Sequence, residues 1–111
     1  MFNLKQFLAM SEEELWLWLI KNNVTDGAVL QCKGGREKPC PSPETLADLA
    51  FRLRDEADEH SYTNALYKVH LTLIRTKKLC DTEISFQHWT QTRITAIDMI
   101  AAALEAKEQS K

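Results

Sequence analysis

One segment of the sequence, residues 11–22 (SEEELWLWLIKN), constrains the fold more than any other. Ser11 and Glu14 have the spacing of a capping box, in which two side chains satisfy free N–H groups in the first turn of a helix. Six consecutive apolar residues follow, from Leu15 to Ile20. At about 100° per residue, such a run covers the whole circumference of a helix and leaves no polar face for water. The run is also too short to cross a bilayer, which requires about 20 residues. We therefore expect this helix to be enclosed by its own domain or completed by another chain.

Length and composition predict one ordinary globular domain covering residues 1–111. Apolar residues make up 44% of the chain and charged residues 27%, which are typical values for such a domain. The net charge is −2, whereas a protein that neutralises phosphates usually has a basic surplus on one face. Three cysteines cannot all pair within one chain, and no signal-peptide pattern precedes them, so we expect a cytoplasmic protein.

Apolar periodicity predicts a mainly α fold of four to five helices. The expected elements are a short helix carrying Leu4, Phe7 and Leu8 with Asn3 as its cap, the helix at residues 11–22, a helix at 43–59 capped by Ser42, a helix capped by Ser61 or Thr63 that ends at Lys78, and a helix at 90–107. Residues 108–111 are expected to be a frayed tail.

One segment favours an extended conformation instead. Val24–Cys32 contains the turn pair Asp26-Gly27 followed by a short apolar run. The next residues, 33–42 (KGGREKPCPS), are rich in glycine and proline and are predicted to be a loop. If a minor two-stranded sheet forms, we therefore expect its second strand at Ile84–Phe86.

The residue types that bind metals are present, but their spacing does not indicate a metal site. The sequence has no CxxC, HxxxH or HExxH pattern, which would place two ligands on one turn. We therefore expect no metal and no other cofactor from the cysteines and histidines, which are Cys32, Cys40, Cys80, His60, His70 and His88.

Catalytic combinations can be assembled from the same residues, but no motif supports them. Cys80 with His88 and Asp81, or His70 with Asp98, would provide a nucleophile or base with an orienting group. The sequence lacks a nucleophile elbow, a kinase lysine and a paired-carboxylate motif. His70 also lies in the middle of an apolar stripe, where a histidine that belongs to the core is common. We therefore expect a protein that is not an enzyme.

The tryptophans of residues 11–22 are the strongest candidates for a partner-binding site. Tryptophan contributes a large contact area and is enriched at binding hot spots. We expect Trp16 and Trp18 to form the site together with Phe7 and Met10, and the loop cations Lys33, Arg36 and Lys38 to form its rim. The alternatives are that the tryptophans fill the core, that a homodimer covers them, and that the loop is only a turn.

A second hypothesis is a nucleic-acid-associated regulatory protein. Its contacts with phosphates would come from a small basic cluster, Arg75, Lys77 and Lys78 with Arg93. The acidic residues Asp81 and Glu83 follow this cluster directly and would oppose phosphate binding.

Two segments of the chain resemble a known group of proteins. Pro41–Asp55 (PSPETLADLAFRLRD) and Trp89–Glu108 (WTQTRITAIDMIAAALEAKE) are similar to small accessory proteins of temperate, lambda-like phages and prophages of enteric bacteria. The resemblance implies a non-enzymatic protein in the cytoplasm of a bacterial host, which binds a host or phage protein and modulates or inhibits it. Host defence and replication proteins are examples of such targets. No binding residue can be transferred, because the group shares no functional motif.

Overall fold

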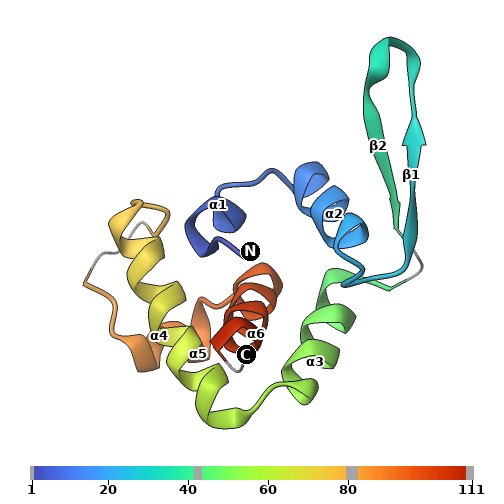
Figure 1. The fold of residues 1–111 in the computed structure, drawn as a ribbon. Coiled ribbons are helices and arrows are strands. Elements are labelled where there is room, and N and C mark those ends of the chain that lie inside the picture. The colour runs from blue at the N-terminus through green and yellow to red at the C-terminus, as the bar shows by residue number, and fades with distance from the viewer. Residues whose placement is uncertain (1, 42–43, 80–82, 110–111) are drawn as a thin grey trace. The chain divides into compact units, whose positions relative to one another are not determined.

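A computed structural model describes residues 2–41, 44–79 and 83–109. In this part of the chain it contains six α-helices and one two-stranded antiparallel sheet (Figure 1). The mainly α fold and the minor two-stranded element are therefore confirmed. The chain divides into two compact units, Ala9–Thr45 and the combination of Met1–Leu8 with Leu46–Lys111. The single domain expected from the length stays a prediction.

The unit Ala9–Thr45 consists of one helix and one hairpin. Its elements are α2 (Glu12–Lys21), β1 (Gly27–Gln31), a 3-10 turn (Lys33–Gly35) and β2 (Glu37–Pro41). The predicted cap of α2 is present, since the Glu14 N–H donates to the Ser11 hydroxyl at 3.3 Å. That hydroxyl in turn donates to the Glu14 carboxylate at 3.0 Å. The helix ends at Asn22, as expected.

The hairpin corrects two predictions. The extended segment at Val24–Cys32 contains β1, but the partner strand is β2 and not Ile84–Phe86. Ile84 is buried and Ser85 caps a helix instead. Residues 33–42 are therefore not a loop throughout, because residues 37–41 return as a strand. The reversal depends on Gly34 and Gly35, whose φ angles of 83° and 78° are ones that glycine adopts readily.

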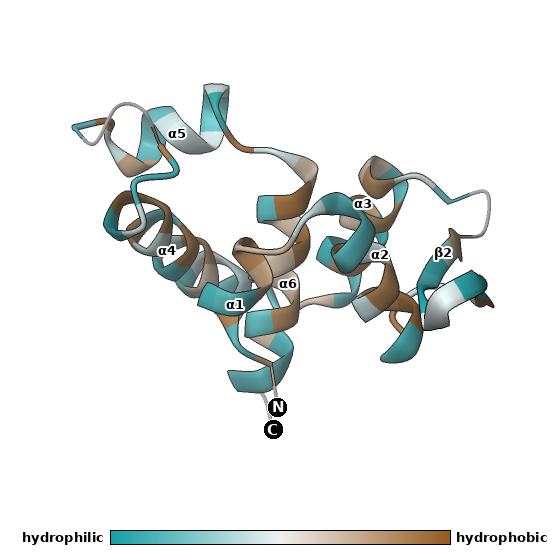
Figure 2. Cartoon of the chain, turned by 90° about the horizontal axis from the view of Figure 1, so that it is seen from above, coloured by the Kyte–Doolittle hydropathy of each residue, from teal (hydrophilic) through white to brown (hydrophobic). Residues whose placement is uncertain are grey.

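The other unit consists of five helices. These are α1 (Leu4–Leu8), α3 (Leu46–Glu56), α4 (Glu59–Arg75), α5 (Phe86–Thr92) and α6 (Ala96–Gln109). Helix α6 contacts α1, α3 and α4, and is therefore the central helix of this unit. Polar and apolar residues alternate around α4 (Figure 2), whose buried side carries Tyr62, Ala65, Val69, His70 and Leu73.

Several helix boundaries differ from those predicted. The helix expected at 43–59 begins at Leu46 and ends at Glu56; its expected cap, Ser42, lies outside the described residues. It ends early because Asp58 accepts the Ser61 N–H at 3.0 Å and starts α4, so neither Ser61 nor Thr63 is the cap.

The helix expected at 90–107 is two helices. A capping box interrupts it, in which the Asp98 N–H donates to the Thr95 hydroxyl at 3.2 Å and the Thr95 N–H donates to the Asp98 carboxylate at 3.1 Å. This break adds one helix to the expected number. Helix α6 then continues to Gln109, so the tail expected at 108–111 is helical for its first two residues; residues 110–111 lie outside the described part.

Candidate partner-binding site

Helix α2 does not bury all of its apolar residues equally. Leu15, Leu19 and Ile20 are buried, whereas Trp16, Leu17 and Trp18 are only half-buried. Residues spaced by four lie on one face of a helix, so Leu15 and Leu19 define the inner face. Each of the two tryptophans therefore retains accessible surface.

The third tryptophan is different. Trp89 in α5 has no exposed surface, and its ring centroid lies 5.2 Å from that of His70 and 6.1 Å from that of Phe86. Trp89 is therefore a core residue. The alternative interpretation that the tryptophans fill the core is therefore correct for Trp89, whereas Trp16 and Trp18 of α2 are only partly buried.

Close packing at one glycine joins α2 to the hairpin. A Cβ atom at Gly27 would lie 2.8 Å from the Cys40 carbonyl oxygen and 3.1 Å from Ile20 Cδ1. An ion pair adds to this contact, since Lys21 Nζ lies 2.9 Å from a carboxylate oxygen of Glu37. The hairpin is thereby held against the helix that carries the tryptophans.

The predicted rim residues are brought together at the tip of the hairpin. Lys33, Arg36 and Lys38 are all exposed. They line a hollow of about 430 Å³ together with Cys32, Glu13 and Glu37. Because Glu37 is paired with Lys21, the hollow has more positive than negative charge available to a partner.

The other two predicted contact residues behave differently. Phe7 is only 1% exposed, contacts Phe2 at a centroid distance of 5.2 Å and belongs to the other unit. Phe7 is therefore a core residue, which corrects its assignment to the partner-binding surface. Met10 is half-buried within the unit Ala9–Thr45.

Two residues of the basic cluster in the nucleic-acid hypothesis, Lys78 and Arg93, make hydrogen bonds within the fold. The Lys78 ammonium donates to the Leu8 carbonyl at the end of α1. Arg93 is the C-cap of α5, where its N–H donates to the Trp89 carbonyl at 2.9 Å. The side chains of Arg75, Lys77 and Arg93 are exposed. Lys78 therefore already has a structural role, and the hypothesis otherwise stays a prediction.

The side chains of Asp98, His70 and Trp89 carry polar atoms and are buried, and only His70 and Asp98 were paired as a possible catalytic set from the sequence. Asp98 is 7% exposed, and burial raises the pKa of its carboxyl, against the opposing effects of the Thr95 hydrogen bonds and the Lys78 charge. In the described part of the chain, His70 Nε2 and Trp89 Nε1 are buried without a hydrogen-bond partner. The position of His70 in an apolar stripe was the only sequence signal for this pair.

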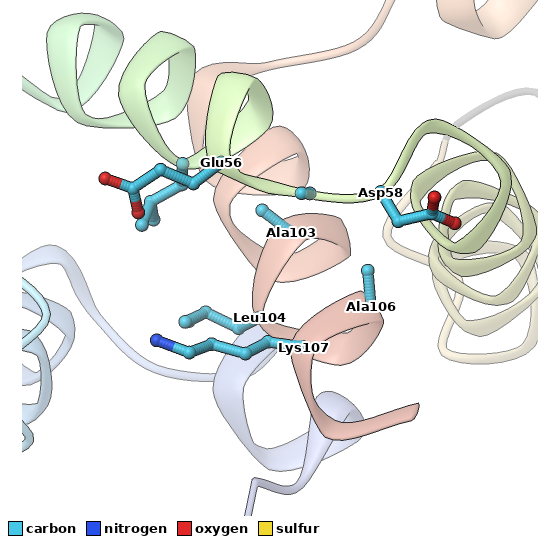
Figure 3. A pocket seen from close by; sticks show the side chains of 8 residues that line it. Glu56, Asp58, Ala103, Leu104, Ala106 and Lys107 are labelled. Carbon is cyan, nitrogen blue, oxygen red and sulfur yellow. The ribbon is translucent and has the colours of Figure 1, made fainter. Parts of the chain in front are cut away.

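A cavity of about 320 Å³ lies where α3 ends, α4 begins and α6 passes. Its floor is apolar, with Leu53, Ala103 and Ala106 among the lining residues. The acidic side chains of Glu56 and Asp58 point away from each other (Figure 3), so they do not form a carboxylate pair there. The cavity therefore has the apolar character of a packing defect or a small apolar pocket.

Among residues 2–41, 44–79 and 83–109, no three or more metal-binding side chains are grouped. Cys32 and Cys40 are exposed and unpaired, while Cys80 and Asp81 of the considered catalytic set lie outside these ranges. None of the helices in these ranges has both the length and the apolar character needed to cross a membrane.

Comparison with protein-family models, curated proteins and solved structures gave no match to this chain.

Proposed function

We propose that the chain is a non-enzymatic protein-binding module that docks on a protein partner through α2 and the tip of the hairpin. The proposal is carried by the incomplete burial of Trp16 and Trp18 in the same unit as an exposed cationic cluster, whose hollow is also lined by Glu13 of α2. Tryptophan at the centre of an interface with charged residues at the rim is the usual anatomy of a binding hot spot.

The chemistry of the site indicates the kind of partner surface that fits it. Trp16 and Trp18 are two positions apart on α2, about 200° around the helix, so their half-buried indoles lie on different flanks and require apolar surface on both sides of the helix. Lys33, Arg36 and Lys38 favour acidic side chains around that surface, because complementary charge increases association rates and specificity. The partner we infer is therefore a protein with an apolar groove that contacts both flanks of α2 and is bordered by acidic side chains.

The similarity to phage and prophage accessory proteins supports a partner from a bacterial host. In this proposal the protein acts in the host cytoplasm as a modulator or inhibitor of a host protein, for example one of defence or replication. Occupying a functional surface of the target is enough for such an effect, so the mechanism requires no cofactor and no bond-making step.

Affinity purification from a nuclease-treated bacterial lysate tests the proposal. The tagged protein is expected to retain a stoichiometric host protein, identified by mass spectrometry, at moderate salt. The double variant W16A/W18A is expected to lose this partner, since truncating a hot-spot residue costs about 2 kcal/mol or more of binding free energy. Far-UV circular dichroism of the variant checks that its helices remain.

Phe51→Ala is the control, because Phe51 is 57% exposed on α3 and its replacement removes an exposed aromatic side chain from the other unit. This variant is expected to bind normally. If W16A/W18A unfolds, the tryptophans belong to the core and the proposal loses its main support. Binding that disappears with nuclease, or weakens steeply as salt is raised, would favour the nucleic-acid hypothesis instead.

A further inference from the structure

The hairpin of the unit Ala9–Thr45 has two edges, and the pattern of its hydrogen bonds shows which backbone groups point outward. In an antiparallel ladder, pairs that bond across the hairpin alternate with pairs whose N–H and C=O groups face away. The Cys32 N–H donates to the Arg36 carbonyl at 2.7 Å, so this pair bonds across the hairpin. The next inward-bonding pairs are then Leu30 with Lys38 and Ala28 with Cys40. The outward-facing pairs are Gln31 with Glu37, Val29 with Pro39 and Gly27 with Pro41.

The two edges are chemically unequal. On β2, two of the three outward positions are proline, which has no N–H to donate, so that edge cannot accept a regular strand. On β1, Gly27, Val29 and Gln31 each present both an N–H and a C=O group. Within the described residues, no other backbone or side chain bonds to these groups. The edge of β1 therefore remains open, and Figure 1 draws it on the side of the hairpin away from α2.

The two faces of the hairpin differ as well. Val29, Glu37 and Pro39 are half-buried on the face that also carries the Lys21–Glu37 ion pair. Ala28 and Leu30 are exposed on the opposite face, and Leu30 has 49% of its surface accessible. An isolated two-stranded hairpin with an uncovered face is marginal in water. Leu30 lies between Val29 and Gln31, two of the residues that form the open edge, so the edge and the exposed leucine belong to one continuous surface.

We infer that β1 pairs in antiparallel fashion with β1 of a second copy of this chain, about a two-fold axis at Val29. The outward positions 27, 29 and 31 are symmetric about this residue, so Val29 faces Val29 of the second copy and Gly27 faces Gln31. Every outward N–H then meets an outward C=O without any shift in register. Leu30 meets Ala28 of the second copy on the open face.

The composition of β1 favours a second copy as the occupant of this edge. The strand GAVLQ has no charged residue, so two copies do not repel each other, and it lacks the lysine or proline that commonly protects an exposed edge. The proline-blocked edge of β2 then ends the sheet on both sides, so the assembly closes as a dimer. The pairing leaves Trp16 and Trp18 unused and is independent of the proposed docking through α2.

Sedimentation equilibrium and cysteine cross-linking of the full chain test this dimer. A monomer–dimer equilibrium is expected between about 10 and about 500 µM protein, because so short an edge gives an interface at the small end of the range. In a background with Cys32, Cys40 and Cys80 replaced by serine, Val29→Cys is expected to form an intermolecular disulfide. The facing Cα atoms would be about 5.5 Å apart, within disulfide range.

Ala28→Cys is the matched control, since it would face Leu30 and lie about 7–8 Å from its own counterpart, beyond disulfide range. It is expected to remain uncross-linked. Val29→Pro provides a second test, because it removes an outward N–H without removing a bond of the hairpin; it is expected to abolish the dimer with circular dichroism unchanged.

A protein that is monomeric throughout this concentration range would overturn the inference. Equal cross-linking of the two cysteine variants would overturn the register. If the amides of Val29 and Gln31 became protected from hydrogen exchange only when another protein was added, a foreign strand would cover the edge, and self-pairing would be wrong.

Discussion

Replacing His70 by leucine is expected to stabilise the protein, although it removes a side chain from the core. His70 is 7% exposed, and its Nε2 atom has no hydrogen-bond partner in the described part of the chain. A buried polar atom without a partner costs about 1–3 kcal/mol, which leucine, of similar volume, would not incur. The substitution also loses ring contacts with Trp89 and Phe86, worth about 0.5–1.5 kcal/mol each. The additional apolar surface that leucine buries offsets part of this loss, at about 0.8 kcal/mol per CH₂ group. The expected net gain in the free energy of unfolding is therefore about 1 kcal/mol.

The measurement is guanidinium-induced unfolding at pH 8, supported by calorimetry, where this gain corresponds to a rise in Tm of about 3–6 °C. His60→Leu is the matched control, because His60 is exposed on the same helix and its replacement should change stability by less than about 0.5 kcal/mol. If His70→Leu instead lost more than about 1 kcal/mol while the control was neutral, Nε2 would have a partner in solution, such as a buried water or a bound ligand. The reasoning from the unpaired atom would then be refuted.

Two further predictions concern Asp98 and Gly27. Burial raises the pKa of Asp98, so the folded state holds the carboxyl proton more tightly than the unfolded state does. The protonated carboxyl therefore contributes stability that is fully present below its ordinary pKa of 3.8. This stability is lost as the pH rises through the folded-state pKa. The free energy of unfolding of Asp98→Asn, compared with that of the natural chain, should therefore be higher at pH 7 than at about pH 3.5. Denaturant titration at both pH values measures this difference, and a difference that does not change with pH would contradict the prediction. Gly27→Ala should cost about 1–3 kcal/mol by the same method, because its Cβ would meet the Cys40 carbonyl oxygen. A Cβ atom at Gly35 would meet open space, so Gly35→Ala should lose only about 1 kcal/mol of stability, through backbone strain. If the two variants lost equal stability, packing at Gly27 would be unimportant.

Elements whose signals are local were predictable from the sequence. The Ser11 cap, the apolar run of α2 and its end at Asn22 are encoded within a few neighbouring residues, and the structure confirms them. The boundary between α5 and α6 was also encoded locally, by Thr95 and Asp98 at capping-box spacing. However, the apolar periodicity continues across this boundary and favours one long helix, so the boundary was not predicted.

Features that depend on contacts between distant residues were not predictable. Two prolines in β2 argue against a strand, unless it is known that the register turns both of them outward. The tryptophans of α2 were recognisable as candidates, but their degree of exposure depends on what packs around them. Phe7 shows the same limit, since an apolar residue close in sequence to the candidate site became a core residue of the other unit.

The path of the chain through the two units has a consequence for biosynthesis. The unit Ala9–Thr45 is continuous in sequence, so it can form as soon as its hairpin has left the ribosome. Helix α1 belongs to the other unit and packs against α4 and α6, and α6 begins only at Ala96. At usual elongation rates, α1 waits on the order of ten seconds for α6, with Phe7 and Leu8 uncovered. Among the helices that pack against α6, α1 is therefore the one whose buried side chains stay uncovered for the longest part of translation.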